Sequence, residues 1–558
     1  MGLNLLNVSS GSLLIALGSH FAFRHKEPTV PQFLSFVTAL QVILCFLWRT
    51  SSDLNDLGLI SLVSTFNICY FAGLGSSIAI YRLFFHPLRK YPGPVLGKLS
   101  KFHFSYICGT GNSHRYLESL HQKYGDIVRY GPNELSFINP DDVTFIHGAQ
   151  SFNLRRGPWY DGNPGRAGHN TLVMASTRNV ENHKVRRRIW DKAFTANALK
   201  SYESRIILLT DRLIKHCEDN SGRIIDISAD IDHFSFDIMG DLGFGEDFGM
   251  IEGTNEESLK WAGLLHSYMR MLSIIRPVPW FKELYKWLPI DRERKRNGLD
   301  FVRFTAKRFE ARYQRGQAAG GDIFEYLLQP DPKSGLQLNK SQVAEEAIVV
   351  VVGGSDTSSI CMTFALYYLL VNPDKYKRAQ EEVDSLWDGV SEDLDGQQLV
   401  PARAPYLNAI INESLRLAEP DPNGNQRSTP KGGAMVNGMF IPESTQLSIH
   451  KWTMQRSERN FTNALEFLPE RWIDEEREAH GIRNHNTKAY IPFGAGVYSC
   501  VGKPLALLEM RLFLTRFMRK LELEPARNYD LERYPWEVTS SLTLMKAALP
   551  VLVRKRVA

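Results

Sequence analysis

Residues 493–502 read FGAGVYSCVG and place a single cysteine, Cys500, in a loop punctuated by glycines. Lys503 and Pro504 follow, and because proline suits the first turn of a helix, we expect a helix to begin directly after the loop. A cysteine in front of a helix N-terminus gains backbone amide donors and the positive end of the helix dipole, and both favour the thiolate. The loop therefore predicts a sulfur with nucleophilic or metal-binding character.

The chemistry of this sulfur has more than one interpretation. A nucleophile needs an oriented base, and no histidine lies near Cys500 in the sequence. A metal site needs only a metal with an open coordination position, and haem iron accepts a single axial cysteine. A lone cysteine in a glycine-rich loop is, in general, more often structural. Taken alone, the loop leaves a haem ligand and a structural cysteine open.

Two shorter motifs precede the loop. Glu413 and Arg416 in ESLR lie three residues apart and share one face of a predicted helix. Such a pair carries little information by itself, because surface ion pairs are common. The sequence PERW at 469–472 follows and contributes Arg471. The order of these motifs is more informative than any one of them.

A long uncharged segment precedes both motifs. From Ala347 to Val371 the only charged residue is Asp356, which predicts a helix through the centre of a large core. Its middle reads GGSDT, and the paired glycines weaken a helix. Asp356 and Thr357 place an acid and a hydroxyl in an apolar wall, where polar groups need partners. The alternative is a helix kink in which Thr357 bonds to a backbone carbonyl.

In the order GGSDT, ESLR, PERW and cysteine loop, the chain resembles the cytochrome P450 family over roughly residues 85–558. The resemblance implies a mainly α fold with a small β portion. It implies that Cys500 is the axial thiolate ligand of haem b, and that Asp356 and Thr357 serve oxygen binding and proton delivery. It also implies a buried structural network of Glu413, Arg416 and Arg471.

The same resemblance assigns further haem contacts. His183 and Arg187 in HKVRR match the family's W/HxxxR helix, and Tyr498 stands where the family usually has Arg or His, two residues before the cysteine. A tyrosine hydroxyl donates one hydrogen bond but brings no positive charge. We therefore expect the cationic residues to carry more of the binding of the haem propionates. The expected cofactor-binding residues are Cys500, Phe493, Gly496, His183, Arg187, Arg427 and Tyr498.

The first 85 residues differ in character from the rest. Residues 1–23, 28–48 and 57–81 contain no charged side chain, and each stretch is long enough to span a bilayer. The positive charges between them place the N-terminus outside and the main domain in the cytoplasm. The alternative is one true anchor, 57–81, preceded by interfacial segments. We expect an anchor over 1–85, a proline-rich hinge over 86–98 and a catalytic domain over 99–558.

Composition excludes several classes of protein. Of the 558 residues, 43% are hydrophobic and 23% charged, which excludes a disordered scaffold. A net charge of +5 does not indicate a nucleic-acid partner. The 6 cysteines show no paired spacing, which excludes a disulfide framework or a zinc site and fits a reducing compartment.

The resemblance is closest to fungal members of secondary metabolism, and it implies a monooxygenase. One oxygen atom from O₂ would enter a lipophilic small molecule, such as a terpenoid, an indole alkaloid, a polyketide or a fatty acid. Two other classes stay open. One is a haem-thiolate isomerase or dehydratase that needs no reductase, although the Asp356–Thr357 pair argues against it. The other is a non-catalytic membrane haem protein, although the complete set of motifs argues against that.

The chain contains nothing that resembles a flavin or NAD site, so electrons must come from a partner. The resemblance implies a separate membrane-bound NADPH-cytochrome reductase, with cytochrome b5 as a second candidate, at the endoplasmic reticulum. Lys192, Lys503 and Arg511 form a candidate basic docking face, with solvated surface charge as the alternative. Segments 151–177 and 268–288 are candidates for the substrate entrance and for a roof near the membrane, although their Met and aromatic residues are more often core.

Overall fold

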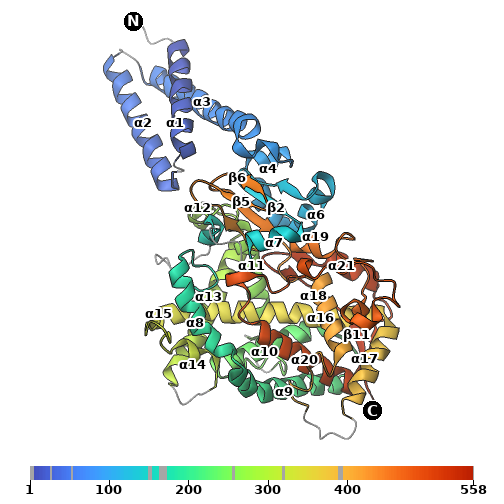
Figure 1. The fold of residues 1–558 in the computed structure, drawn as a ribbon. Coiled ribbons are helices and arrows are strands. Elements are labelled where there is room, and N and C mark those ends of the chain that lie inside the picture. Colours follow the sequence, from blue (N-terminus) through green and yellow to red (C-terminus); the bar gives the residue numbers. More distant parts are fainter. Residues whose placement is uncertain are drawn as a thin grey trace.

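The computed structural model describes residues 5–25, 28–51, 55–148, 154–162, 173–253, 258–316, 321–387 and 394–556. Three N-terminal helices project from a large, mainly helical body in which a few short strands lie near the anchor side and at the C-terminal edge (Figure 1). This arrangement confirms the predicted fold class, a mainly α domain with a small β portion behind apolar N-terminal helices.

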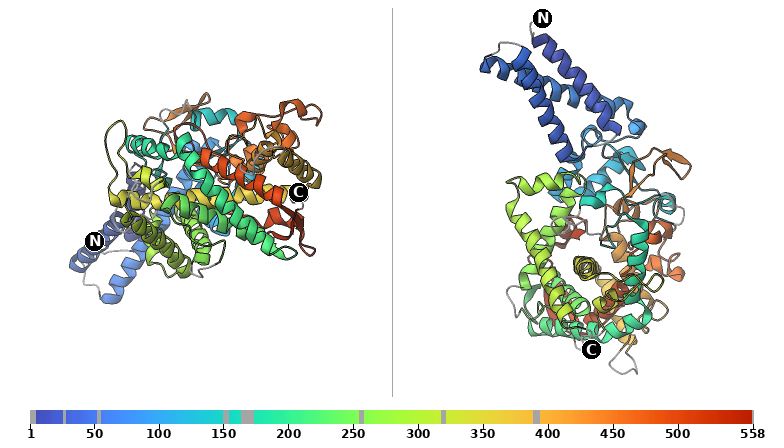
Figure 2. Two further views of the ribbon diagram at one scale, coloured as in Figure 1. Left: turned by 90° about the horizontal axis from the view of Figure 1, so that it is seen from below. Right: turned by 90° about the vertical axis from the view of Figure 1, so that its left-hand side faces the viewer.

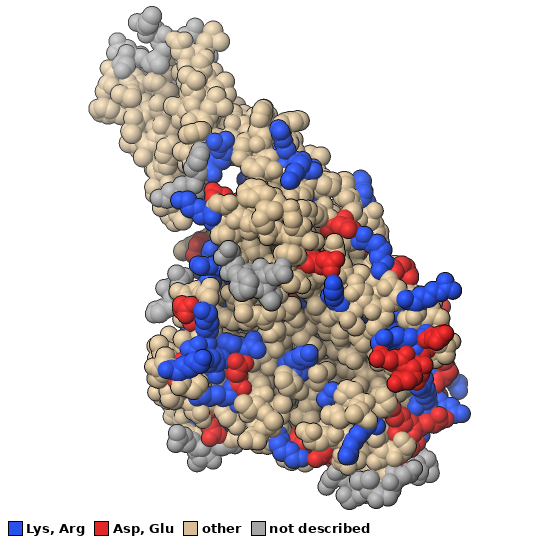
Figure 3. All heavy atoms as spheres, viewed as in Figure 1, with Lys and Arg blue, Asp and Glu red and all other residues tan. Residues whose placement is uncertain are grey.

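The three N-terminal helices are α1 (Leu5–His25), α2 (Val30–Ser51) and α3 (Asp56–Ile80), and α3 continues into a π-helical turn, η1 (Tyr81–Phe85). Each is long and apolar enough to cross a membrane. They share a small apolar cluster around Phe66 and Tyr70, and the Tyr70 hydroxyl donates to Ser19 at 3.1 Å. The face seen in Figure 3 has almost no charge over this projection. These helices indicate a membrane anchor.

The segment after the anchor is docked on the body. A Cβ at Gly93 would lie 2.0 Å from the carbonyl oxygen of Arg129, so only glycine permits this close approach. The backbone N–H of Arg129 donates to Pro92 at 2.7 Å, and Leu88 is fully buried. The proline-rich segment 86–98 therefore fixes the direction in which the anchor leaves the body.

The predicted central helix is present in three parts: α15 (Lys340–Val351), a π-helical turn η7 (Val352–Asp356) and α16 (Thr357–Val371). By length and composition it is a fourth candidate span among the described residues, but 67% of an apolar 18-residue stretch of it is buried inside the body. Figure 2 shows it end-on, surrounded by other helices. The π turn falls on Gly353-Gly354, and such turns often mark functional sites.

The other helices pack around this axis, and α10 lies along all three of its parts. The longer ones are α6 (Ser113–Tyr124), α8 (Val180–Asp191), α9 (Ala196–Asp219), α10 (Ile227–Phe244), α11 (Trp261–Ile275), α13 (Arg292–Gln314), α17 (Pro373–Ser385), α18 (Pro405–Leu417) and α20 (Lys503–Lys520). The shorter ones are α4 (Val95–Leu99), α5 (Lys101–Thr110), α7 (Pro140–Ile146), α12 (Phe281–Trp287), α14 (Ile323–Leu327), α19 (Lys451–Gln455) and α21 (Tyr534–Glu537).

The strands form small sheets. The largest has the order β1-β2-β7-β4, in which β2 and β7 pair in parallel and the other neighbours are antiparallel. Its strands are β1 (Ile127–Arg129), β2 (Glu134–Phe137), β7 (Gln446–Ile449) and β4 (Arg427–Ser428). The others are β3 (Ile224–Asp226) with β11 (Pro550–Lys555) and β8 (Leu521–Pro525), β5 (Ala434–Val436) with β6 (Met439–Ile441), and β9 (Thr539–Ser540) with β10 (Leu544–Met545).

Candidate active site

A cavity of about 350 Å³ lies between the central helix and the loop that carries the cysteine. It contains most of the residues that the sequence assigned to the cofactor. Those lining it are Cys500, Phe493, Tyr498, His183, Arg187, Arg427 and Thr357, joined by Arg156. We call this cavity the cysteine chamber.

The backbone conformation of the cysteine loop depends on its glycines. Gly496 has φ 68°, and a Cβ there would lie 2.0 Å from the carbonyl oxygen of His147. The backbone N–H of Cys500 donates to Phe493 at 2.9 Å, which closes the loop in front of α20. Glycine is therefore required at 496 both for the backbone conformation and for the close packing of the loop.

The surroundings of Cys500 act in opposite directions on the pKa of its thiol. Burial raises the pKa of its thiol above the ordinary value, while hydrogen bonds from the N–H groups of Gly502 and Lys503 and the charge of Arg187 work in the opposite direction. The N–H groups at the start of the helix lower the pKa of the Cys500 thiol, as predicted, but desolvation raises that pKa by more. A metal cation at the sulfur supplies the missing stabilisation of the thiolate, so the site fits a coordinated iron.

Tyr498 lies beside two guanidinium groups and a histidine ring. The guanidinium carbons of Arg156 and Arg427 lie 4.4 and 4.5 Å from the centre of its ring, and the His183 ring is 4.5 Å away. Burial, Arg156, Arg187 and Arg427 together lower the pKa of His183 to about 3. Like charges gathered in a buried wall favour an anion beside them, so the chamber fits a group that carries carboxylates.

Arg156 is the cation that the sequence analysis missed. Its guanidinium donates to the carbonyl oxygens of Met174 at 2.7 Å and Thr177 at 3.0 Å, while its Nε is buried with no hydrogen-bond partner among the described residues. It stands in the plain sequence NLRRGP, which belongs to none of the motifs. Only the fold brings it to Tyr498, where the family's usual Arg or His is missing.

The three consecutive arginines of α8 point in different directions. Arg186 forms a buried ion pair with Glu346 at 2.6 Å, and Arg188 forms a partly buried ion pair with Asp331 at 2.7 Å. Arg187 lines the cysteine chamber and donates to the carbonyl oxygen of Ser499 at 2.6 Å. Of the three, Arg187 is thus the one placed beside the cysteine loop.

The structure separates Asp356 from Thr357. The Thr357 hydroxyl donates to the carbonyl oxygen of Gly353 at 2.7 Å across the π turn, and Thr357 lines the chamber. The Asp356 carboxylate is buried on another side of the helix, where it accepts a hydrogen bond from the Thr543 hydroxyl and lies 3.4 Å from His266. The bond from Thr357 to a backbone carbonyl, given above as part of the alternative, is therefore present at a π turn, and His266 is a neighbour of Asp356 that the sequence did not indicate.

Glu413, Arg416 and Arg471 form a fully buried network. Arg416 binds both oxygens of Glu413 at 2.8 and 2.9 Å, and Arg471 binds one of them at 2.9 Å. Burial alone would raise the pKa of Glu413, but the two arginines hold it below its ordinary value. Trp472 adds a hydrogen bond at 3.0 Å. The network joins α18 to the short helix η8 (Pro469–Trp472).

The family model for cytochrome P450 matches residues 87–546. The chain belongs to the cytochrome P450 family. It is 31% identical to cytochrome P450 67 of Uromyces fabae over 93% of this chain and 94% of that protein. It is 31% identical to tryprostatin B 6-hydroxylase of Aspergillus fumigatus over 90% of this chain and 87% of that protein. The solved haem domain of cytochrome P450DA, 21% identical, shares the fold with a TM-score of 0.66 over 84% of this chain and 98% of that domain.

Family membership confirms the predicted class of function. The protein is a cytochrome P450 monooxygenase, an oxidoreductase, and its relatives are mostly fungal enzymes of secondary metabolism. Nothing supports the isomerase or the non-catalytic haem protein. Cytochrome P450 enzymes use haem with a cysteine thiolate ligand, O₂, a redox partner and a small-molecule substrate.

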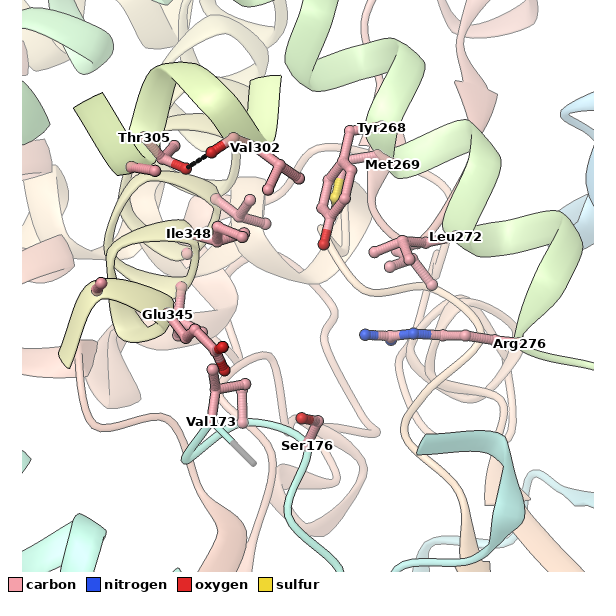
Figure 4. A pocket seen from close by; sticks show the side chains of 17 residues that line it. Val173, Ser176, Tyr268, Met269, Leu272, Arg276, Val302, Thr305, Glu345 and Ile348 are labelled. Carbon is pink, nitrogen blue, oxygen red and sulfur yellow. Dashed lines mark hydrogen bonds between the residues drawn. The ribbon is translucent and has the colours of Figure 1, made fainter. Parts of the chain in front are cut away.

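A second cavity, of about 200 Å³, adjoins the cysteine chamber of this cytochrome P450, and we call it the distal chamber. The two share Ala175, Val349 and Gly353 as wall residues. Figure 4 shows the distal chamber between α11, α13, α15 and the segment around 173–176. Both segments suggested for the substrate contribute to it, although 151–153 and 163–172 lie outside the described residues.

Members of the 268–288 segment have different surroundings. Met269 lines the distal chamber, whereas Met271 belongs to the core and lies against Gly298. Trp280 and Trp287 are exposed, Trp287 to 85%, at the two ends of α12. Figures 1 and 2 place α12 on the side of the body from which the anchor leaves. The segment is thus partly chamber wall, partly core and partly an apolar surface beside the anchor.

The three residues of the candidate basic docking face differ in exposure and in hydrogen bonding. Lys503 is exposed at the start of α20. Lys192 donates to the carbonyl oxygen of Pro330 at 2.6 Å, and Arg511 donates to the side chain of Asn408 at 2.8 Å. Burial lowers the pKa of Arg511. Of the predicted trio, Lys503 is therefore the residue that is exposed, whereas Lys192 and Arg511 are partly buried and donate hydrogen bonds within the body.

Proposed function

We propose that this cytochrome P450 binds haem b in the cysteine chamber with Cys500 as the axial ligand. The observation that carries the proposal is the placement of Cys500 in a chamber that has a cationic wall and that shares Ala175, Val349 and Gly353 with the mostly apolar distal chamber. When bound, haem supplies the oxygen-activating chemistry, and a thiolate ligand favours cleavage of the O–O bond.

The cationic wall would hold the haem carboxylates. Arg156, Arg187 and Arg427 carry permanent charge, and the guanidinium fork matches a carboxylate. His183 stays neutral at physiological pH in the absence of an anion and contributes a ring N–H. Tyr498 contributes its aromatic face to Arg156 and Arg427. Phe493 and Gly496 shape the loop that presents Cys500.

Asp356 and Thr357 would control protons on the distal side. The Thr357 hydroxyl oxygen lies at the chamber wall, and its proton is held on the carbonyl oxygen of Gly353. Asp356 lies on another side of the helix, with its carboxylate beside His266 of α11. A proton would pass from the Asp356 carboxyl towards the chamber only when that side chain turns away from Thr543 and His266. The carboxylate oxygen would hold that proton before delivery.

The substrate would be a lipophilic small molecule in the distal chamber, oxidised by hydroxylation, epoxidation or a related reaction. Support for a fungal secondary metabolite, a terpenoid, an indole alkaloid or a polyketide, comes from the names of relatives such as tryprostatin B 6-hydroxylase. The apolar lining from α11 and α15 fits such a molecule.

The electron donor would be a membrane-bound NADPH-cytochrome reductase, with cytochrome b5 as a second donor, docking near Lys503. The three N-terminal helices would anchor the enzyme in the endoplasmic reticulum with the catalytic domain facing the cytosol, as the charges between the apolar stretches favour. In this arrangement 1–85 is the anchor, 86–98 the docked hinge and 99–558 the catalytic domain.

The assignment of Cys500 has a direct test in the carbon monoxide difference spectrum of the reduced protein. Cys500→Ala should remove the long-wavelength Soret band that a thiolate ligand produces. Cys361 in α16 is a matched control, because its buried thiol also lines the chamber and burial raises its pKa. Cys361→Ala should keep the band. A band that survives Cys500→Ala would contradict the proposal.

A further inference from the structure

Two hydroxyl groups, those of Tyr268 and Ser176, line the distal chamber without a hydrogen-bond partner among the described residues. Figure 4 shows the Tyr268 side chain entering the chamber from α11 with its hydroxyl foremost, and the Ser176 hydroxyl on the other side. The hydroxyl of Thr305, by contrast, donates to the carbonyl oxygen of Val302 at 3.0 Å. Two neutral polar groups are thus left for a ligand in a mostly apolar cavity.

The charged residues of the chamber wall give no reason to expect an ionic ligand. Arg276 and Glu345 both interact with other groups of the protein. The guanidinium carbon of Arg276, for example, lies 4.3 Å from the centre of the Trp159 ring. The two residues also differ in the sign of their charge, so together they do not select a ligand of one sign. Recognition in this chamber therefore depends on the neutral hydroxyls.

Of the two hydroxyls, the phenol of Tyr268 is the stronger hydrogen-bond donor, because a phenol is more acidic than a serine hydroxyl. Burial raises the pKa of Tyr268 to about 12, although the charge of Arg276 acts in the opposite direction, so the proton stays on the oxygen at neutral pH. The Tyr268 ring lies 5.4 Å from the ring of Phe301, a contact that holds the side chain in place. Tyr268 therefore offers a proton to an acceptor in the chamber.

A donor in an apolar cavity has a specific use in ligand binding. A buried hydroxyl without a partner costs free energy, and a ligand oxygen that accepts its proton removes that cost. In binding pockets a small number of polar groups fix the orientation of a lipophilic ligand among apolar walls. The distal chamber has this composition, because its other walls include Met269, Leu272 and Ile348.

We propose that the Tyr268 hydroxyl donates a hydrogen bond to a neutral oxygen of the substrate, so that this enzyme prefers lipophilic molecules with a carbonyl group at one end; the inference rests on the proposed function of the two chambers. The apolar body of the substrate extends along Leu272 towards Val349 and Gly353, where the chambers meet. The carbonyl group then lies at the end away from the site of oxidation. Tyr268 is thus a specificity-determining residue that fixes which end of the substrate enters the cysteine chamber.

The test compares ketones with alkenes of the same shape on the full-length haem-loaded enzyme. The pairs are 4-phenylbutan-2-one with (3-methylbut-3-enyl)benzene and 2-dodecanone with 2-methyl-1-dodecene, in which a CH₂ group replaces the carbonyl oxygen. Binding is measured by equilibrium dialysis, and the substrate-induced spin-state change of the haem spectrum is recorded in parallel. Tyr268→Phe should weaken the binding of at least one ketone about fivefold or more, as the loss of one hydrogen bond implies, and should leave its alkene within about twofold.

Two further variants separate Tyr268 from other hydroxyls. Tyr313→Phe is the matched control, because Tyr313 is 40% exposed on α13, outside both chambers. It removes the same group and should leave the affinities for ketones and alkenes unchanged. Ser176→Ala removes the second free hydroxyl of the chamber. Loss of ketone affinity in Ser176→Ala but not in Tyr268→Phe would place the carbonyl group at the opposite wall and overturn the role of Tyr268.

The outcomes distinguish this inference from the assignment of the haem ligand. A wild type with an intact carbon monoxide band that binds neither ketone overturns the proposed preference. Unchanged ketone affinity in Tyr268→Phe, or an equal loss for ketone and alkene, overturns the hydrogen bond from Tyr268. Loss of the carbon monoxide band in the wild type itself would instead overturn the proposed function.

Discussion

The Nε2 atom of His266 on α11 lies 3.4 Å from a carboxylate oxygen of Asp356 in the π turn of the central helix. A second pair is adjacent, with Lys546 at 3.0 Å from Asp232. Burial and Lys546 oppose protonation of His266, but Asp356 and Asp232 outweigh them and raise its pKa. The contact ties α11, which lines the distal chamber, to the residue beside Thr357.

This contact predicts a pH-dependent contribution to stability. The pKa of His266 is higher in the folded protein than its ordinary value of 6.5, so the stabilisation is complete below pH 6.5 and is lost as the pH rises through the folded pKa. His266→Gln should lower the thermal midpoint most at acidic pH, by the equivalent of about 1 kcal/mol. Thermal unfolding of both proteins between pH 5.5 and 9 measures this. A difference that is independent of pH would contradict a charged pair.

Arg156 is expected to hold the haem. Arg156→Gln removes a cation from the wall around Tyr498, and we expect haem to leave about tenfold faster, as the loss of one charge-assisted contact implies. Transfer of haem to excess apomyoglobin measures the rate. Arg155→Gln is a matched control, because Arg155 is the exposed neighbour in the sequence. Equal rates for the two variants would remove Arg156 from the haem site.

The Thr357 hydroxyl is expected to matter for coupling rather than for folding. Thr357→Ala removes the hydroxyl that donates to Gly353 at the chamber wall, so more of the NADPH consumed should appear as hydrogen peroxide. Thr357→Ser keeps the hydroxyl and should keep most of the coupling. Peroxide and product are measured per NADPH in the reconstituted system. Normal coupling in Thr357→Ala would show that protons reach the oxygen by another route.

Much of this organisation could be predicted from the sequence. The cysteine loop and the central helix follow from a local motif and an uncharged run, and the Glu413–Arg416–Arg471 network follows from the resemblance to the cytochrome P450 family. Arg156 and His266 could not be found in this way. Each acquires its role from a contact with a distant segment: Arg156 with Tyr498, and His266 with Asp356. The sequence around them is ordinary.

The separation of Asp356 from Thr357 has the same origin. In the sequence they are adjacent and were expected to act together above the haem. On a helix, neighbouring residues point in directions about 100° apart, so one side chain reaches the chamber and the other reaches α11. The π turn at Gly353-Gly354 determines that Thr357 faces the chamber and Asp356 faces α11. The position of the turn depends on the packing of Gly354 against Met239 of α10.

The buried network around Glu413 is expected to decide whether the protein folds. Glu413→Gln would leave Arg416 and Arg471, both fully buried, without their counter-charge. Breaking such a network costs about 3–5 kcal/mol, so little folded haem protein should accumulate. The yield of the carbon monoxide band per unit of total protein measures this. Glu466→Gln, at an exposed position nearby, should give a wild-type yield; a normal yield for Glu413→Gln would show that the charge is dispensable.

Trp287 is expected to insert into the membrane surface beside the anchor. It is 85% exposed at the end of α12, and tryptophan favours the boundary between lipid and water. In full-length protein, Trp287→Cys should react with a membrane-impermeant maleimide in detergent and be protected in lipid nanodiscs, as read by peptide mass spectrometry. Trp536→Cys is the control, since Trp536 is 74% exposed on α21, on the other side of the body from α12 in Figure 1. It should react equally in both settings. Equal labelling of position 287 in detergent and in nanodiscs would mean that α12 stays in water, and the anchor helices would then hold the domain clear of the bilayer.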